Sequence, residues 1–379
     1  MAQPGLGKNS PVVLSLGKAN YEALIERHGQ WVRWRTARKC ACMTETGQPN
    51  VHCEKCGGTG DIYGYQKFYN DTLQVKVRDN IFELPEDYTG SEVLKVYDTK
   101  GSNFSYRKTG QFVEITGGTR PLSQNEILEA LVKNSAVKRL ESASLEKTGS
   151  GYYRVPGIES PARKLDGVYY RAPGDVIAVE KVMNPAGEEI AVSGCRQNMI
   201  QVESDADDLT AYGVEYILPF KFLVLSQELN KADAQMMNAH NGDAVCTFPY
   251  MFDVAENDVI TVLSGTMTTK AVINKRGGAA DDVIPEFFVQ AVQSLETKET
   301  AYREGTDFVL TGTNRIHWLG ENRPEAGAVM SLVYQYLPTY RVAMNIPNLR
   351  TSEDQRIPRK AVLKLNAAWQ ESKRINQNG

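Results

Sequence analysis

Apolar and polar residues alternate along most of the chain, and this pattern predicts β-strands. The clearest alternating runs are Thr72–Val77, Glu92–Tyr97, Gln111–Ile115 and Ala328–Tyr336. Successive residues of a strand point to opposite faces, so each run predicts one buried face and one solvent-facing face. Pro338 is expected to end the last strand. Short strands with frequent turn residues favour a mainly β protein built from sandwich or barrel modules, with few helices.

Three segments carry the features of helices. The first is Ala19–His28, which Gly29 is expected to end. The second begins with the capping-box pair Ser123 and Glu126 and continues with Ile127, Leu128, Leu131 and Val132 at helical spacing. The third is Ser226–His240. The polar stretch Ser142–Gly151 after the second helix predicts a linker or loop.

A faint internal repeat follows. Asp175–Val179 and Asp258–Val262 share the pattern D-V-I-x-V, and each comes after a turn-like segment. The pattern favours two or three similar β units, although a five-residue match is short.

The chain has 379 residues, which is more than a single core normally supports. We therefore expect a multi-domain protein. The expected units are an extended arm at 1–17, a helix plus cysteine hairpin at 18–70, a β domain with one helix at 71–150, a β domain at 151–245, and a C-terminal β domain with a basic tail at 246–379.

Charge is distributed unevenly along the chain. Residues 1–40 carry seven Lys/Arg against two Asp/Glu, residues 341–379 carry eight against three, and the net charge of the whole chain is −3. Basic ends on an acidic body can bind nucleic acid or the acidic body of a neighbouring copy. We favour the second interpretation, because the basic residues do not form a dense tract. The sequence has no apolar run long enough for a membrane span and no secretory signal, so we expect synthesis in a reducing cytoplasm.

The strongest chemical signal is a cluster of four cysteines, Cys40, Cys42, Cys53 and Cys56. Ten residues separate the C-x-C pair from the C-x-x-C pair, which suits two facing turns around one tetrahedral metal ion. The flanking segments Trp31–Arg35 and Asp61–Tyr69 both indicate strands, as in a zinc ribbon. We therefore predict a structural Zn²⁺ site in a small N-terminal hairpin, where Gly57 and Gly58 allow a close turn.

Other interpretations of the cysteines stay open. Two disulfides clipping the same hairpin are the main alternative, although a cytoplasmic origin disfavours them. His52 is a weaker candidate to replace one cysteine ligand. Cys195 and Cys246 are isolated in sequence and are expected to be buried free thiols.

Catalytic motifs are absent from the sequence. It contains no phosphate-binding loop, no H-E-x-x-H and no G-x-S-x-G, and it has four histidines. We therefore expect a protein that is not an enzyme.

The alternating segment beside the cysteines, Trp31, Arg33, Trp34 and Arg35, is expected to bind a partner, held in shape by the metal hairpin. A zinc-dependent nucleic-acid-binding adaptor is the alternative of another class, and it would use the same four residues with Arg38 and Lys39 on DNA.

Two groups of segments resemble virion structural proteins of tailed bacteriophages, especially contractile-tailed ones. The first group is Tyr21–Gln30 and Val32–Arg35 with the cysteine cluster after it; the second is Tyr302–Phe308, Ile316–Trp318, Arg323–Gly327 and Tyr334–Tyr340. The likeness covers about 80 residues near the two ends of the chain. It indicates membership of the virion better than a position within it.

The resemblance implies a structural role without turnover. We expect a neck, collar or connector ring that joins head and tail, with a baseplate or tail-attachment protein as the alternative. The implied partners are copies of the chain itself, six or twelve in a ring, and virion proteins such as the portal, tail terminator or tube. DNA contact is not favoured and no membrane is involved. The implied location is the virion, assembled in the host cytoplasm.

Overall fold

The computed structural model describes residues 18–365, except 45, 54, 57–59, 99, 150, 166–167, 226–242, 250, 278–280, 287, 312–313, 321 and 347–358. The expected arm at 1–17 and the expected helix at Ser226–His240 lie outside the described residues. So do the end of the expected basic tail and the glycines Gly57 and Gly58.

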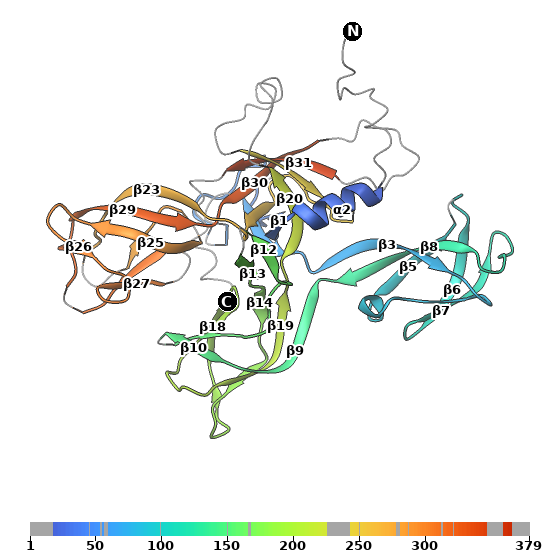
Figure 1. Ribbon diagram of the computed structural model, residues 1–379, viewed down its shortest axis with the longest axis horizontal. Coiled ribbons are helices and arrows are strands. Elements are labelled where there is room, and N and C mark those ends of the chain that lie inside the picture. Colours follow the sequence, from blue (N-terminus) through green and yellow to red (C-terminus); the bar gives the residue numbers. More distant parts are fainter. Residues whose placement is uncertain are drawn as a thin grey trace, which may run out of the picture.

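The described chain is mainly β and consists of a central barrel with three β lobes around it (Figure 1). The first lobe spans residues 68–135, the second 137–217 and the third 267–336. Each lobe is inserted between strands of the barrel, to which the chain returns after the second and third lobes. The predicted mainly β, multi-domain fold is confirmed.

The barrel sheet has seven strands in the described part of the chain. They are β1 (Gln30–Lys39), β2 (Asp61–Tyr65), β20 (Phe220–Leu225), β21 (Ala244–Phe248), β22 (Val259–Val262), β30 (Thr339–Ile346) and β31 (Arg359–Leu365). Strand β1 closes the barrel because it pairs antiparallel with β20 on one side and with β22 on the other. β2 extends the sheet beyond the closure by pairing with the second half of β1.

Alternate residues of the barrel strands fill its interior. Val32, Trp34, Phe222, Val342 and Leu363 belong to this core, and all are almost fully buried. The barrel draws strands from three of the units expected from the sequence, 18–70, 151–245 and 246–379. Its strands come together over long sequence separations, which no local pattern indicates.

The first lobe is one curved sheet around its own core. Its strands, in sheet order, are β3 (Phe68–Lys76), β8 (Ile127–Ser135), β5 (Glu92–Tyr97), β6 (Asn103–Thr109), β7 (Phe112–Gly118) and β4 (Ile81–Glu83). The predicted strands in this region are confirmed.

The predicted helix after Ser123 is wrong, because this segment forms β8. Leu128, Ala130 and Val132 are fully buried between β3 and β5, with the two-residue period of a strand. The Glu126 carboxylate does accept the backbone N–H of Ser123 at 2.9 Å, but the bond closes a turn before a strand. Tertiary pairing with two neighbouring strands therefore overrides the local helix signal.

The second lobe packs two sheets and a short hairpin. Its strands are β9 (Val137–Ser144), β10 (Glu146–Gly149), β11 (Tyr152–Arg154), β12 (Arg163–Leu165), β13 (Val168–Tyr170), β14 (Asp175–Ala178), β15 (Lys181–Met183), β16 (Glu189–Ile190), β17 (Val192–Arg196), β18 (Met199–Val202) and β19 (Thr210–Ile217).

The linker predicted at Ser142–Gly151 is wrong, because Ser142–Ser144 end β9 and Glu146–Gly149 form β10. β9 pairs with β19 over its whole length, and this pairing satisfies the backbone of an otherwise polar segment.

The third lobe is a sandwich of a four-stranded and a three-stranded sheet. The strands are β23 (Met267–Asn274), β24 (Asp282–Val283), β25 (Val289–Glu296), β26 (Ala301–Tyr302), β27 (Phe308–Thr311), β28 (Arg315–Trp318) and β29 (Val329–Tyr336). The strand predicted at Ala328–Tyr336 is confirmed as β29, with Met330, Leu332, Tyr334 and Tyr336 buried on one face.

Helix is scarce in the described chain, which contains α2 (Lys18–His28) and the short 3-10 turn η1 (Glu86–Tyr88). The predicted helix at Ala19–His28 is confirmed. The Gly29 N–H donates to the carbonyl of Ile25 at 2.7 Å, and a Cβ at Gly29 would lie 2.3 Å from that carbonyl oxygen. Glycine is therefore required where α2 ends and β1 begins.

Candidate metal centre

Strands β1 and β2 present the cysteine loop. They pair from Arg35 opposite Tyr65 to Lys39 opposite Asp61, and the Cys40 N–H donates to the Gly60 carbonyl at 2.8 Å. The described residues between Cys40 and Gly60 thus lie at the closed end of a hairpin, as the spacing predicts. Gly60 has a positive φ of 78°, a backbone conformation that favours glycine.

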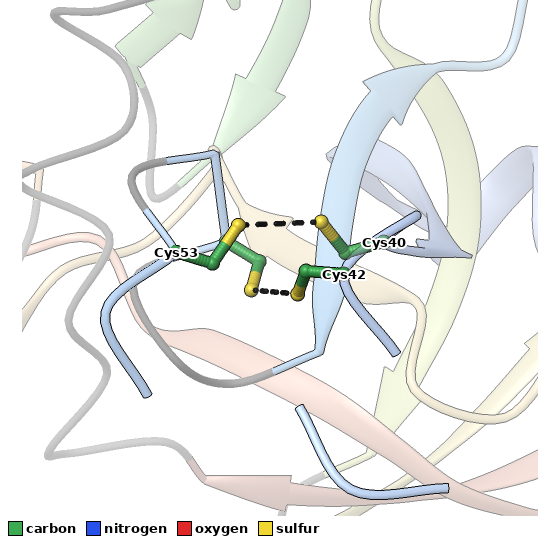
Figure 2. A group of neighbouring side chains, drawn as sticks. Cys40, Cys42 and Cys53 are labelled. Atoms are coloured by element: carbon green, nitrogen blue, oxygen red, sulfur yellow. Dashed lines mark hydrogen bonds between the residues drawn. The ribbon is translucent and has the colours of Figure 1, made fainter. Parts of the chain in front are cut away.

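Two reverse turns bring the cysteines together inside this loop. The Met43 N–H donates to the carbonyl of Cys40 at 3.1 Å, and the Cys53 N–H donates to the carbonyl of Asn50 at 3.0 Å. Figure 2 shows Cys40 and Cys42, which follow β1, directed toward Cys53 on the facing turn. A bridge between Met43 and Pro49 holds the two turns side by side.

The four sulfurs form a compact group. All lie within 4.8 Å of one another; Sγ of Cys40 is 3.7 Å from Sγ of Cys53, and Sγ of Cys42 is 3.4 Å from Sγ of Cys56. A tetrahedral ion with metal–sulfur bonds of about 2.3 Å requires sulfur–sulfur distances of about 3.8 Å. The four cysteines therefore match a tetrahedral site in size and could hold a metal ion.

Local polar contacts favour negative charge on some of the sulfurs. The backbone N–H of Gly60 donates to Sγ of Cys56 at 3.3 Å. A hydrogen bond from the Cys56 backbone lowers the pKa of Cys53, whereas burial and the hydrogen bond to Cys56 raise the pKa of Cys42 to about 12. Thiolates bind metal, so a cation at the centre would offset the cost of charging Cys42.

The arrangement suits a structural site with four protein ligands and no open position for substrate. The exposed His52 lies outside the sulfur group, which does not support its replacing a cysteine. All six cysteines are free: Cys246 is buried in the barrel core and Cys195 is half-buried in the second lobe.

The segment predicted to bind a partner is buried within the chain. Trp31, Arg33, Trp34 and Arg35 all lie on β1, and Trp34 is only 1% exposed. The barrel core encloses Trp34, and the lobes cover the other three. The predicted partner-binding residues are thus buried within the chain, and Arg38 and Lys39 are the exposed basic residues of β1.

Two buried aspartates beside β1 were not recognised from the sequence. Asp258 accepts hydrogen bonds from Trp34 Nε1 and the Ala37 N–H, both at 2.8 Å. Asp175 accepts a hydrogen bond from Arg33 Nε at 2.6 Å. Each is the first residue of a D-V-I-x-V segment, so the repeated aspartate was a usable signal. The two segments form strands in different sheets, β14 and β22.

Comparisons with known proteins leave the chain without an assigned family. No family model matches it, and no curated protein sequence matches it. Within the described residues, none of the helical structure is both long and apolar enough to cross a membrane.

Proposed function

We propose that this chain is a structural component of a tailed-phage virion, assembled in the host cytoplasm as a ring of six or twelve copies. The neck or collar between head and tail is the favoured position, and a baseplate or tail-attachment site is the second choice. The likeness of the terminal segments to phage virion proteins supports the virion, and the contrast between two sheet edges supports assembly through subunit contacts.

Two edge strands of equal length, β9 and β23, differ in how strongly their charges oppose pairing with a strand of another chain. β9 carries Lys138, Arg139 and Glu141 along its eight residues, and charges on an edge oppose pairing with another chain. β23 has the sequence MTTKAVIN, with Lys270 as its one charge.

β23 also has the regular geometry of a docking edge. It pairs with β29 over eight residues without a register shift, and in the described part of the chain it pairs with no strand on its other side. Val272 on β23 is 69% exposed, and Val329 on the adjacent β29 is 60% exposed. This edge suits the addition of an extended segment from a neighbouring subunit, whose backbone would continue the sheet.

A charge placed on this edge tests the proposal. Wild-type protein is expected to form concentration-dependent rings in analytical ultracentrifugation and negative-stain images. Val272→Lys is expected to shift the protein toward monomers while leaving its unfolding transition unchanged. Ser142→Lys adds the same charge to the exposed face of β9 and should assemble like wild type. Wild-type protein that stays monomeric, or Val272→Lys protein that assembles normally, would contradict the proposal.

We further propose that the ion held by the four cysteines is Zn²⁺. Four thiolates in a tetrahedron suit zinc or an iron–sulfur centre. The four sulfurs lie too close together to surround a cluster of several iron atoms, so they suit a single ion, and we assign that ion to zinc. Elemental analysis should find one zinc per chain, whereas iron together with the visible absorbance of a cluster would exclude this assignment.

A further inference from the structure

Two pairs of sulfurs bridge the two turns of the cysteine loop. Sγ of Cys40 lies 3.7 Å from Sγ of Cys53, and Sγ of Cys42 lies 3.4 Å from Sγ of Cys56. Figure 2 shows the first of these contacts crossing from the end of β1 to the facing turn. The sulfur–sulfur bond of a disulfide is about 2.05 Å long, so the sulfurs of either pair need to approach by less than about 2 Å to form one.

Each pair joins a half-buried cysteine to a buried one. Cys42 and Cys53 are half-buried, whereas Cys40 is 3% exposed and Cys56 is fully buried. A small oxidant in solution therefore meets Cys42 or Cys53 first, and a buried thiol lies in contact with the sulfur that has reacted. An accessible cysteine beside a second thiol that resolves it is the arrangement that leads to a disulfide.

Pairing within each motif would not replace the function of a metal ion. A disulfide between Cys40 and Cys42, or between Cys53 and Cys56, closes a very short loop and leaves the two turns unlinked. The cross-turn pairs are separated by 13 and 14 positions along the chain. Disulfides between them would hold the same two turns together that the bridge between Met43 and Pro49 places side by side.

The proposed function exposes the cysteine loop to two redox environments. The host cytoplasm, where assembly is proposed, keeps thiols reduced, and the exterior to which virions are released is oxidising. A hairpin with few large apolar side chains needs a cross-link in both environments. Thiolates that bind a metal ion provide the cross-link in the first environment, and disulfides provide it in the second.

We propose that the four cysteines exchange their metal ion for two disulfides, Cys40–Cys53 and Cys42–Cys56, when a peroxide oxidises them. This inference rests on the proposed zinc site and on the proposed role in a virion. The exchange keeps the hairpin closed after the protein leaves the reducing cytoplasm.

The reaction at each pair consumes one peroxide. The accessible sulfur attacks one peroxide oxygen, the O–O bond breaks, and a sulfenic acid and a hydroxide form. The buried partner sulfur then attacks the sulfenic sulfur, the S–S bond forms and the second hydroxide leaves. Two thiolates are thereby oxidised, and the peroxide is reduced to two hydroxides, which take up two protons to give water. Thiolates are the metal ligands, so their conversion to disulfides releases the ion.

Disulfide mapping of the full chain tests the pairing. Zinc-loaded protein is treated with hydrogen peroxide, the remaining thiols are blocked, and cross-linked peptides are identified by mass spectrometry. Digestion after Lys and Glu separates Cys53 from both Cys42 and Cys56. Both cross-turn disulfides should form as about one zinc per chain is released, and Cys246 in the barrel core should remain a thiol.

Two variants make the assignment specific. Cys42→Ser should lose one disulfide and keep the other, so the peptide that carries Cys40 should be linked to the peptide of Cys53 and not to that of Cys56. Cys195→Ser is the control, because Cys195 lies in the second lobe, and this variant should oxidise like wild type.

Hydrogen exchange provides a second measurement on wild-type protein. Amides of β2 should stay protected in oxidised, zinc-free protein and lose protection in reduced protein treated with a chelator. Disulfides within a motif, a different cross-turn pairing, or oxidation to sulfinic acid without disulfides would overturn the proposal while leaving the zinc site intact. Reduced protein that holds no zinc would overturn the zinc site, and this inference with it.

Discussion

The two halves of strand β1 are held in place by different means. The first half, Gln30–Arg35, lies between β20 and β22 in the closed barrel, and its five residues from Trp31 onward are buried. The second half, Thr36–Lys39, pairs with β2, and Arg38 and Lys39 are exposed. The hydrophobic core of the barrel stabilises the first half, whereas the second half is continuous with the loop that carries the four cysteines.

This difference follows from how much apolar surface each half can bury. Trp34 packs against Phe220, Phe222 and Phe252, with ring centres 5.7, 6.1 and 5.8 Å away. The hairpin beyond Thr36 has few large apolar side chains, and Val51 at its turn is 72% exposed. A small segment without a core needs another source of stability, which a metal ion can provide.

Removing the metal should have the largest effect, confined to the hairpin half. Structural zinc sites contribute on the order of 10 kcal/mol to local folding in small peptides. A strong chelator, or Cys56→Ser, should therefore abolish amide protection in residues 40–65 in hydrogen-exchange mass spectrometry. Amides of Val32 and Trp34 should keep their protection, because the barrel core does not depend on the ion.

Cys195→Ser is the matched control for the metal experiment. Cys195 lies in the second lobe, away from the four sulfurs, so this variant should keep one metal per chain and an unchanged exchange pattern. Loss of metal without loss of hairpin protection would mean that the two halves of β1 share one source of stability.

Truncating Trp34 should have the next largest effect, now on the barrel half. Trp34→Ala removes a fully buried indole and should lower the free energy of unfolding by about 3–5 kcal/mol in urea titrations. Hydrogen exchange should rise in β20, β22 and β30. Metal content below the unfolding transition should be unchanged.

Trp318→Ala separates this effect from a general loss of an indole. Trp318 Nε1 also donates to a buried aspartate, Asp282, at 2.7 Å, but in the third lobe. Its truncation should increase exchange in β27–β29 and leave the barrel protected. Equal effects of both variants on hydrogen exchange in the barrel would show that the lobes and the barrel unfold as one unit. The two halves of β1 would then not be stabilised separately.

The same comparison explains which features were predictable. The hairpin is local: the cysteine spacing and the flanking strands Trp31–Arg35 and Asp61–Tyr69 contain the information that brings the sulfurs together. The strand β29 was predictable for the same reason, because its alternation is clean. The barrel closure depends on β1 pairing with β20 and β22 far along the chain, and nothing in the residues of β1 specifies those partners.

The misassigned segments show where local patterns fail. Ile127–Val132 fits a helix by its cap and by Leu128, Leu131 and Val132, yet it also alternates through Leu128, Ala130 and Val132. Pairing with β3 on one side and β5 on the other selects the two-residue period of a strand over the period of a helix. Arg33 and Arg35 were predicted to bind a partner, but both are buried, with Asp175 and Phe288 beside them, and no local pattern indicates these neighbours.

Asp258 joins the two halves of β1 and gives the smallest predicted effect. Its Oδ2 accepts hydrogen bonds from Trp34 Nε1 and the Ala255 N–H, and its Oδ1 accepts one from the Ala37 N–H in the hairpin half. Burial raises the pKa of Asp258 in spite of these three bonds. The folded protein thus holds this proton more tightly than the unfolded chain, where the pKa of aspartate is about 3.9.

The sign of the pH dependence follows from this difference. Below about pH 3.9 both states are protonated at Asp258 and the aspartate costs no stability through ionisation. Between the pKa of the unfolded chain and the raised pKa, the folded state keeps a proton that the unfolded chain has released. The free energy of unfolding therefore falls as pH rises through this range and levels off above the raised pKa. The cost is present at neutral pH and is relieved by acid, which is opposite to the usual behaviour of a salt-bridged carboxylate.

Asp258→Asn isolates this contribution because asparagine does not titrate. Its oxygen can still accept from Trp34 and Ala255, but its NH₂ group opposes the Ala37 N–H, so the variant loses about 1–3 kcal/mol independently of pH. The difference in unfolding free energy, wild type minus variant, should therefore be largest near pH 4 and decrease toward neutral pH in urea titrations. A difference that rises with pH would mean that the three hydrogen bonds outweigh burial. Asp258 would then bind the hairpin half to the barrel as an ion, and the two halves of β1 would be less independent than their separate stabilising features indicate.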